Sequence, residues 1–179
     1  MPPPGYGTLK QDDIAIRLQT STLQLTVLPL DEHVLRLLAS DAWSALHQLV
    51  STRDSIIEET ARAAGYADPS LFLVMLFGLD QETTFNPDDL TLESRNQFFR
   101  PIGVVPITPH WGSHHLNQRE TAIAIFLFEP DIAVWEPMTV SFGSASSNQW
   151  ERTLRRLDQE RANALARAGT APSDTSERR

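Results

Sequence analysis

Hydrophobic and polar residues alternate along several short runs between Thr83 and Gly143. The clearest runs cover residues 90–93, 122–128 and 138–143. Alternation with a period of two places one set of side chains in a core and the other toward solvent, as in an antiparallel strand. Prolines separate or border these runs, where a missing N–H is tolerated: Pro87, Pro101, Pro106, Pro109, Pro130 and Pro137. The region is therefore predicted to form antiparallel β-sheet.

Two further segments outside that region also have the pattern of strands. Residues 14–19 and 23–28 alternate on either side of a polar turn, which predicts a hairpin that Pro29 ends. Residues 71–77 are apolar on both faces and lie between Asp68-Pro69 and Gly78. This pattern favours a central strand covered on both sides, and a short buried helix stays open as the alternative.

Helical periodicity follows the hairpin and returns near the end of the chain. Asp31 is a suitable N-cap for a helix over residues 31–39, and apolar residues recur at steps of three and four over 41–64, where Gly65 ends the pattern. We expect the apolar face of these helices to cover one side of the sheet. An apolar stripe also predicts a helix over residues 148–168.

The two ends of the chain have a different composition. Residues 1–10 contain Pro2-Pro3-Pro4 and two glycines, which predicts an extended, polyproline-like arm that is disordered or lies along a partner. Residues 169–179 are rich in small and charged residues and are predicted to be a disordered tail. Residues 11–168 are expected to form a single β-sandwich domain with the helical insertion 31–64 and the C-terminal helix 148–168.

The segments Thr84–Pro101, Ala124–Glu129 and Met138–Gly143 together resemble immunoglobulin-like β-sandwich modules of bacterial envelope and accessory proteins. The resemblance covers about a third of the chain and includes no catalytic signature. It implies an α+β chain that is mainly β, namely an Ig-like antiparallel sandwich with a helical insertion and a C-terminal helix. The long helical segment before these strands is a departure from a plain seven-stranded module.

Composition excludes several classes of function. The chain has 179 residues, enough for one domain, and no cysteine, so disulfides, thiolate metal sites and cysteine nucleophiles are excluded. Its formal charge of −8 disfavours nucleic acid and anionic membrane surfaces, and a basic partner fits better. No phosphate-binding glycine loop or nucleophile elbow is present, so no cofactor is expected.

The N-terminus lacks the apolar stretch of a signal peptide, and the longest apolar run, Leu71–Leu79, is far shorter than the roughly 20 residues of a spanning helix. We therefore do not expect an integral membrane protein. The compartment is not determined by the sequence, and a cytoplasmic location or a peripheral position on a membrane complex both stay open.

A histidine cluster is the densest group of potential metal ligands. His110, His114 and His115, with Glu120, contain nitrogen and oxygen donors suitable for zinc. The spacing of His110 and His114 fits a helix, but the neighbouring prolines and Gly112 oppose one. A metal-dependent enzyme or metal-binding protein that uses this cluster is therefore the alternative hypothesis.

The leading hypothesis is a non-catalytic protein-interaction module that docks as an accessory or scaffolding subunit on a larger complex, membrane-associated or not. Trp111 and Trp135 lie in proline-flanked loops, where aromatic side chains often anchor interfaces. Arg152, Arg155 and Arg156 belong to the one locally basic stretch and are candidates for docking. A carbohydrate-binding sandwich that stacks sugars on the two tryptophans is a third possibility.

Overall fold

The computed structural model describes residues 1–170, and residues 171–179 of the predicted tail lie outside the described residues. The elements follow one another as α1 (Gln11–Ile14), β1 (Ile16–Gln19), β2 (Leu23–Pro29), α2 (Glu32–Leu35), α3 (Ser40–Ser51), α4 (Asp54–Ala63), β3 (Ser70–Gly78), β4 (Glu82–Thr84), the 3-10 helix η1 (Pro87–Asp89), β5 (Leu90–Ser94), β6 (Gln97–Phe99), β7 (Gly103–Pro106), η2 (Trp111–Ser113), β8 (His115–Asn117), β9 (Thr121–Phe128), β10 (Met138–Phe142), β11 (Ala145–Ser147) and α5 (Trp150–Thr170).

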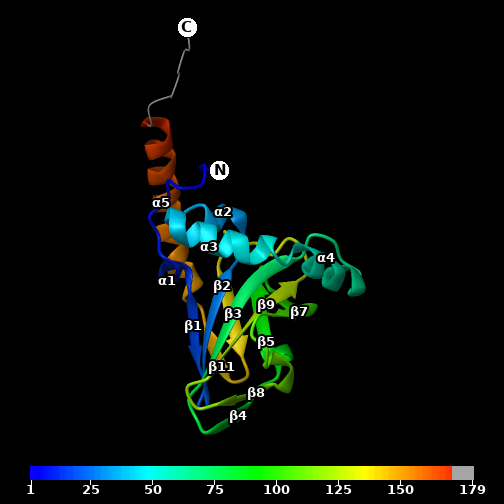
Figure 1. Cartoon of the computed structure of the whole chain (residues 1–179). Coiled ribbons are helices and arrows are strands. Elements are labelled where there is room, and N and C mark those ends of the chain that lie inside the picture. Colours follow the sequence, from blue (N-terminus) through cyan, green and yellow to red (C-terminus); the bar gives the residue numbers. More distant parts are fainter. Residues whose placement is uncertain (171–179) are drawn as a thin grey trace.

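Within residues 1–170 the strands form a five-stranded sheet, a four-stranded sheet and a two-stranded ribbon (Figure 1). Their orders are β1-β2-β3-β9-β7, β11-β10-β5-β6 and β4-β8, and every pair is antiparallel. The predicted antiparallel sheets are confirmed. The fold is nevertheless a mixture of helix and strand rather than mainly β, because about 34% of the residues are helical and about 33% are in strands.

β3 is the central strand of the five-stranded sheet, as its two-sided apolar pattern predicted. It pairs with β2 from Leu23↔Gly78 to Pro29↔Phe72, and with β9 from Ser70↔Phe128 to Phe77↔Thr121. The predicted hairpin is confirmed as β1 and β2. In these continuous ladders the backbone N–H and C=O groups of β3 bond to the neighbouring strands, so they are satisfied although the strand is buried.

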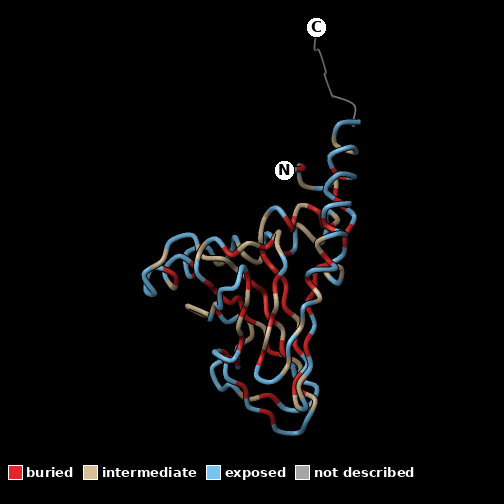
Figure 2. Tube along the Cα trace, turned by 180° about the vertical axis from the view of Figure 1, so that it is seen from behind, coloured by how far each residue is buried: buried red, intermediate tan, exposed pale blue. Residues whose placement is uncertain are grey.

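The buried faces of both large sheets contribute to one hydrophobic cluster. In Figure 2 buried positions follow the strands through the middle of the molecule, while exposed positions lie on the helices and outer loops. Trp150, at the start of α5, is completely buried, and its indole N–H donates to the carbonyl of Val134 at 2.7 Å. This bond fixes the loop before β10 against the C-terminal helix, because a buried indole N–H left without a partner is costly.

The helical insertion differs from the prediction in two respects. The first helix, predicted over residues 31–39, is a single turn, α2, which ends at Leu35, and Leu37 and Leu38 bond to Leu9 of the arm instead. Instead of one helix over 41–64, α3 ends at Ser51 and α4 begins at Asp54. The reason is local: the Thr52 hydroxyl donates to the Gln48 carbonyl (2.8 Å) and Arg53 Nη1 donates to the Leu49 carbonyl (3.0 Å), which satisfies the last carbonyls of α3 and closes it.

The predicted ends of the insertion are confirmed. Asp31 is the N-cap of α2, and Gly65 has a φ of +87° after α4, where a left-handed residue ends the helix. Figure 1 shows α3 and α4 across one end of the five-stranded sheet. None of the helices in residues 1–170 combines the length and the apolar character that crossing a membrane requires.

The N-terminal arm, residues 1–10, lies beside α5 (Figure 1). Leu9 forms a parallel bridge with Leu38, and Arg167 Nη1 donates to the Tyr6 carbonyl at 2.7 Å. The backbone N–H and the hydroxyl of Thr8 both donate to Glu160 Oε1 at 2.9 Å. The second half of the arm is therefore bonded to its own chain.

Glu160 is the centre of this attachment. It is 6% exposed and also accepts from Arg167 Nη1 at 2.8 Å. Burial alone raises the pKa of Glu160, but the hydrogen bonds from Arg167 and Thr8 and the charge of Arg167 outweigh it, so the pKa is lowered. The ionised carboxylate is the form that holds the arm.

The first prediction concerns the close approach of β3 to the turn after β8. A Cβ at Gly78 would overlap the carbonyl oxygen of Asn117, whereas a Cβ at Gly112 would meet nothing within 4 Å. Gly78→Ala should therefore lower the free energy of unfolding by about 1–3 kcal/mol. Gly112→Ala is the control and should stay within about 0.5 kcal/mol of the unsubstituted chain in denaturant unfolding. Equal stabilities of the two variants would contradict this packing.

The second prediction is a dependence of stability on pH. Because the folded pKa of Glu160 is lowered from 4.5, its contribution is present above that pH and is lost as the pH falls through the lower folded value. Glu160→Gln should cost about 1 kcal/mol at neutral pH. The difference between the two proteins in urea midpoints should shrink as the solution is acidified below pH 4.5. A difference that is independent of pH would refute the role of the ionised carboxylate.

Candidate functional site

Three acidic loops meet at the helix-covered end of the five-stranded sheet. β2 ends at Pro29, β3 begins at Ser70 and β9 ends at Phe128, and these ends are paired in register as Pro29↔Phe72 and Ser70↔Phe128. Because neighbouring strands are antiparallel, the C-terminal ends of β2 and β9 and the N-terminal end of β3 lie at the same end of the sheet. The segments that continue from them contain Asp31, Asp68 and Asp131, which are therefore brought together.

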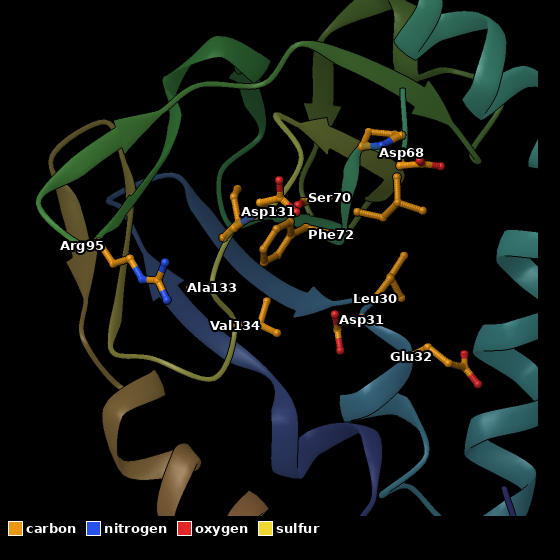
Figure 3. A pocket seen from close by; sticks show the side chains of 13 residues that line it. Leu30, Asp31, Glu32, Asp68, Ser70, Phe72, Arg95, Asp131, Ala133 and Val134 are labelled. Carbon is orange, nitrogen blue, oxygen red and sulfur yellow. Dashed lines mark hydrogen bonds between the residues drawn. The ribbon is translucent and has the colours of Figure 1, made fainter. Parts of the chain in front are cut away.

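These loops surround a pocket of about 490 Å³. Its walls include the apolar side chains of Phe72, Ile132 and Val134, and Figure 3 shows Arg95 across the pocket from Asp68 and Glu32. A second pocket of about 450 Å³, between α4 and the start of β3, shares Asp68, Pro69 and Leu71 with the first. We call the two pockets together the acidic groove.

The groove is strongly negative. Its lining has six carboxylates and two guanidinium groups: Asp31, Glu32, Asp54, Glu58, Asp68 and Asp131 against Arg62 and Arg95. Arg95 is already compensated, since its Nε and Nη2 donate to the two carboxylate oxygens of Glu136 at 2.6 Å each. This bidentate pair raises the pKa of Arg95 and lowers that of Glu136.

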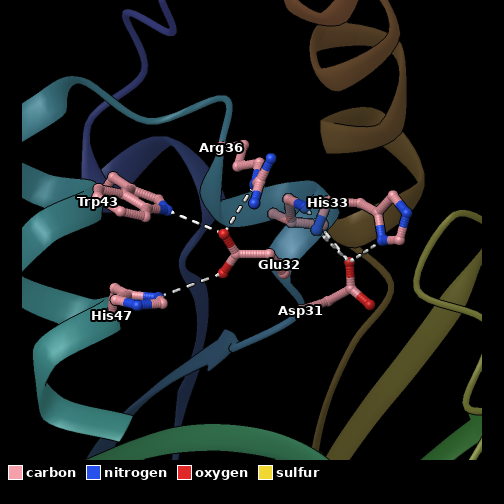
Figure 4. A network of polar contacts seen from close by, with 7 residues as sticks. Asp31, Glu32, His33, Arg36, Trp43 and His47 are labelled. Atoms are coloured by element: carbon pink, nitrogen blue, oxygen red, sulfur yellow. Dashed lines mark hydrogen bonds and ion pairs between the residues drawn. The ribbon is translucent and has the colours of Figure 1, made fainter. Parts of the chain in front are cut away.

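The helices hold the carboxylate of Glu32 in place (Figure 4). Glu32 Oε1 accepts from Arg36 Nε at 2.8 Å and from the Trp43 indole at 3.2 Å. Its other oxygen lies 3.6 Å from His47 Nδ1, and the rings of Trp43 and His47 are stacked with centroids 4.7 Å apart. This network joins α2 to α3 and limits the freedom of the Glu32 side chain.

Asp68 and Asp131 are placed differently, because both have left-handed backbones, with φ of +50° and +68°. Such values are uncommon outside glycine, although aspartate tolerates them better than most residues. Within residues 1–170 no hydrogen bond or ion pair joins either carboxylate to another group. Both are exposed, so they are available to a ligand at the rim of the pocket.

The groove combines polar acceptors with apolar side chains. The hydroxyl in the first pocket, Ser70 Oγ, accepts from the Ile132 N–H at 3.3 Å, and the acidic groups of the lining are carboxylates. No group of three or more potential metal ligands occurs in the part of the chain that the structure describes. What the groove offers is carboxylate acceptors above an apolar floor, which suits cationic side chains with aliphatic stems.

Comparison of the chain with protein-family models, with curated protein sequences and with solved structures finds no match.

The histidine cluster lies at the opposite end of the sheet, around η2 and β8 (Figure 1). His110 and His114 are exposed, and His114 packs its ring against Phe85, with centroids 5.4 Å apart. The Asn117 N–H donates to Glu120 Oε2 at 2.7 Å, and this bond, aided by the nearby His115 and His110, lowers the pKa of Glu120. The Glu120 carboxylate therefore stabilises the turn between β8 and β9.

The two loop tryptophans differ in their burial. Trp111 is 4% exposed and lies among Phe85 and Phe126, so it is a core side chain and offers no platform for a sugar or a partner. Trp135 is half-buried, and the guanidinium of Arg161 lies 5.7 Å from its ring centroid. Of the two, only Trp135 presents a surface.

The basic residues of α5 are also in different environments. Arg152 and Arg155 are exposed, whereas Arg156 forms an ion pair with Asp13 at 2.9 Å and so links α5 to α1. The guanidinium that contacts Trp135 belongs to Arg161, which is not one of these three residues.

The acidic groove was not anticipated from the sequence, although a signal was present. Each of the three central strands has a proline and an aspartate near the same end: Pro29 with Asp31, Pro69 with Asp68, and Pro130 with Asp131. Prolines marked these positions as turns, but the order of strands in the sheet was needed to show that the turns are neighbours.

The third prediction concerns the histidine cluster. A stable zinc site needs three or four protein donors, and residues 1–170 contain no such group. Zinc should therefore raise the melting temperature of the chain no more than that of the double variant His114→Ala, His115→Ala. Specific stabilisation of the unsubstituted chain by zinc, abolished in the variant and reversed by a chelator, would contradict this interpretation.

Proposed function

We propose that this protein is a non-catalytic interaction module, an accessory or scaffolding subunit whose acidic groove holds a basic, extended segment of a protein partner. The observation that carries the proposal is the charge of the groove, six carboxylates against two guanidinium groups of which one is already paired. Attraction of this sign accelerates encounter with a basic partner and disfavours acidic ones.

The shape of the groove supports the same function. Two adjoining pockets of about 490 and 450 Å³ have room for several side chains along a line. Lysine and arginine have apolar stems and charged heads, so their stems fit against Leu71, which is half-buried and lines both pockets, while their heads reach Asp68 and Asp131. The left-handed backbones of the two aspartates add support, because uncommon conformations cluster at binding sites.

The resemblance to immunoglobulin-like modules of bacterial envelope and accessory proteins belongs to the same proposal. It is supported by two large antiparallel sheets that share one core. Such scaffolds commonly bind partners through the loops at one end of the sheets, and the acidic groove has that position. A module of this kind needs no cofactor, and a peripheral place on a membrane complex is compatible with it.

The fourth prediction tests the groove by removing two of its negative charges. Asp68→Asn with Asp131→Asn removes both rim charges, and asparagine tolerates the left-handed backbone, so the fold should be preserved. Binding of a fluorescent peptide of alternating arginine and alanine should weaken about three- to tenfold, at roughly 0.3–0.7 kcal/mol for each exposed charge. Anisotropy titrations at low and high salt provide the measurement.

The matched control is Asp88→Asn with Asp89→Asn, at exposed positions before β5 that line neither pocket. Both double variants change the net charge equally, so bulk attraction predicts equal losses of affinity. Equal losses would overturn the proposal, whereas a loss confined to the groove variant supports it. The two double variants can also be immobilised and exposed to a lysate. A protein that the control variant retains and the groove variant does not is a partner of the groove, whereas proteins bound by net charge alone are retained equally by both.

A further inference from the structure

A small cavity of about 160 Å³ lies between the N-terminal arm and the body of the protein. Met1 and Pro2 of the arm line it together with His33, Trp135 and Arg161. Pro2 is buried although it belongs to an extended terminal segment, and Trp135 is half-buried under the guanidinium of Arg161. The cavity is separate from the acidic groove, with which it shares no lining residue.

The chemistry of this cavity suits proline. A proline ring presents an apolar, rigid surface, and segments with consecutive prolines adopt the extended polyproline form before they bind, so little conformational entropy is lost. Aromatic side chains are the usual surface for such segments. Trp135 supplies the aromatic ring, Arg161 lies over it in a cation–π contact, and Pro2, the buried first proline of Pro2-Pro3-Pro4, packs at the site.

The arm is attached unevenly. From Tyr6 onward it is bonded to Arg167, Glu160 and Leu38. For residues 1–5 no hydrogen bond to the rest of residues 1–170 is present, so packing alone holds them. Gly5, with a φ of +91°, lies at the junction of the two parts. The proline segment can therefore leave its cavity while the remainder of the arm stays in place.

We propose that the cavity formed by Trp135, Arg161 and His33 is a proline-recognition site, covered in cis by Met1 and Pro2 of the arm, and that its external ligand is a proline-rich extended segment of a partner protein that displaces them. Pro2, which is buried at this cavity, indicates which chemistry the site accepts. This inference goes beyond the acidic groove and does not depend on it.

The test compares a filled and a vacated site in the full chain. Pro2→Gly, Pro3→Gly and Pro4→Gly together remove the internal ligand and leave the bonds of residues 6–10 unchanged. A labelled peptide with the sequence of residues 1–7, Met-Pro-Pro-Pro-Gly-Tyr-Gly, should bind this variant at least about tenfold more tightly than the unsubstituted chain, whose own arm competes at high effective concentration. The same peptide with alanine at its three prolines is the ligand control.

Two substitutions in the vacated variant then locate the site. Trp135→Ala should abolish binding of the peptide, whereas Phe98→Ala, which removes an exposed aromatic side chain from β6, should preserve it. Equal affinities of the filled and vacated chains, or binding that survives Trp135→Ala, would overturn the inference. The pair Asp68→Asn and Asp131→Asn should leave peptide binding unchanged, so failure here and failure of the groove are distinguishable.

A second measurement covers the case in which the glycine variant does not fold. The unsubstituted chain, labelled with ¹⁵N, is titrated with the peptide to millimolar excess. The indole resonance of Trp135 should shift, and the amide resonance of Gly5, the one residue of 1–5 with an observable backbone N–H, should move to the position of a free segment, while those of Thr8 and Leu9 stay. Unchanged spectra at these positions would equally refute the proposal.

Discussion

The pairing of β3 with β2 on one side and β9 on the other is the constraint on which the molecule depends. Both faces of β3 are largely buried, so the strand is stable only inside a sheet that is covered on both sides, and its two ladders run over nearly its full length. These ladders decide more than stability. Because the register aligns Pro29 with Phe72 and Ser70 with Phe128, the loops beyond them meet, and the acidic groove is a consequence of sheet topology.

The helices contribute carboxylates and one wall to the acidic groove at this end of the sheet. The break between α3 and α4 lets the insertion turn across the strand ends, so that α4 forms one wall of the second pocket. The bonds from Arg36 and Trp43 hold Glu32 at the rim, whereas Asp68 and Asp131 have no such partners in residues 1–170. Carboxylates that are held by hydrogen bonds and carboxylates that are available to a ligand therefore line the same groove.

The loop between β9 and β10 connects the two proposed sites. Asp131 and Val134 face the acidic groove, Trp135 lines the proline cavity, and Glu136 pairs with Arg95. The bond from the Trp150 indole to the Val134 carbonyl anchors the middle of this loop to the core. A partner that contacts both sites would therefore meet a rigid surface, and the loss of conformational entropy on binding would be small.

The sequence by itself determined the antiparallel strands, the central position of β3, the Asp31 cap and the helix that begins near Trp150, since each follows from periodicity or from local backbone preference. It did not determine the end of α3, which depends on side chains that bond to specific carbonyls. It also could not show that Trp111 is buried while Trp135 lines a cavity, because both are tryptophans in proline-flanked loops. The groove and the seat of the arm were decided only by tertiary structure, since both join residues far apart in the chain, and local patterns carry no information about which loops become neighbours.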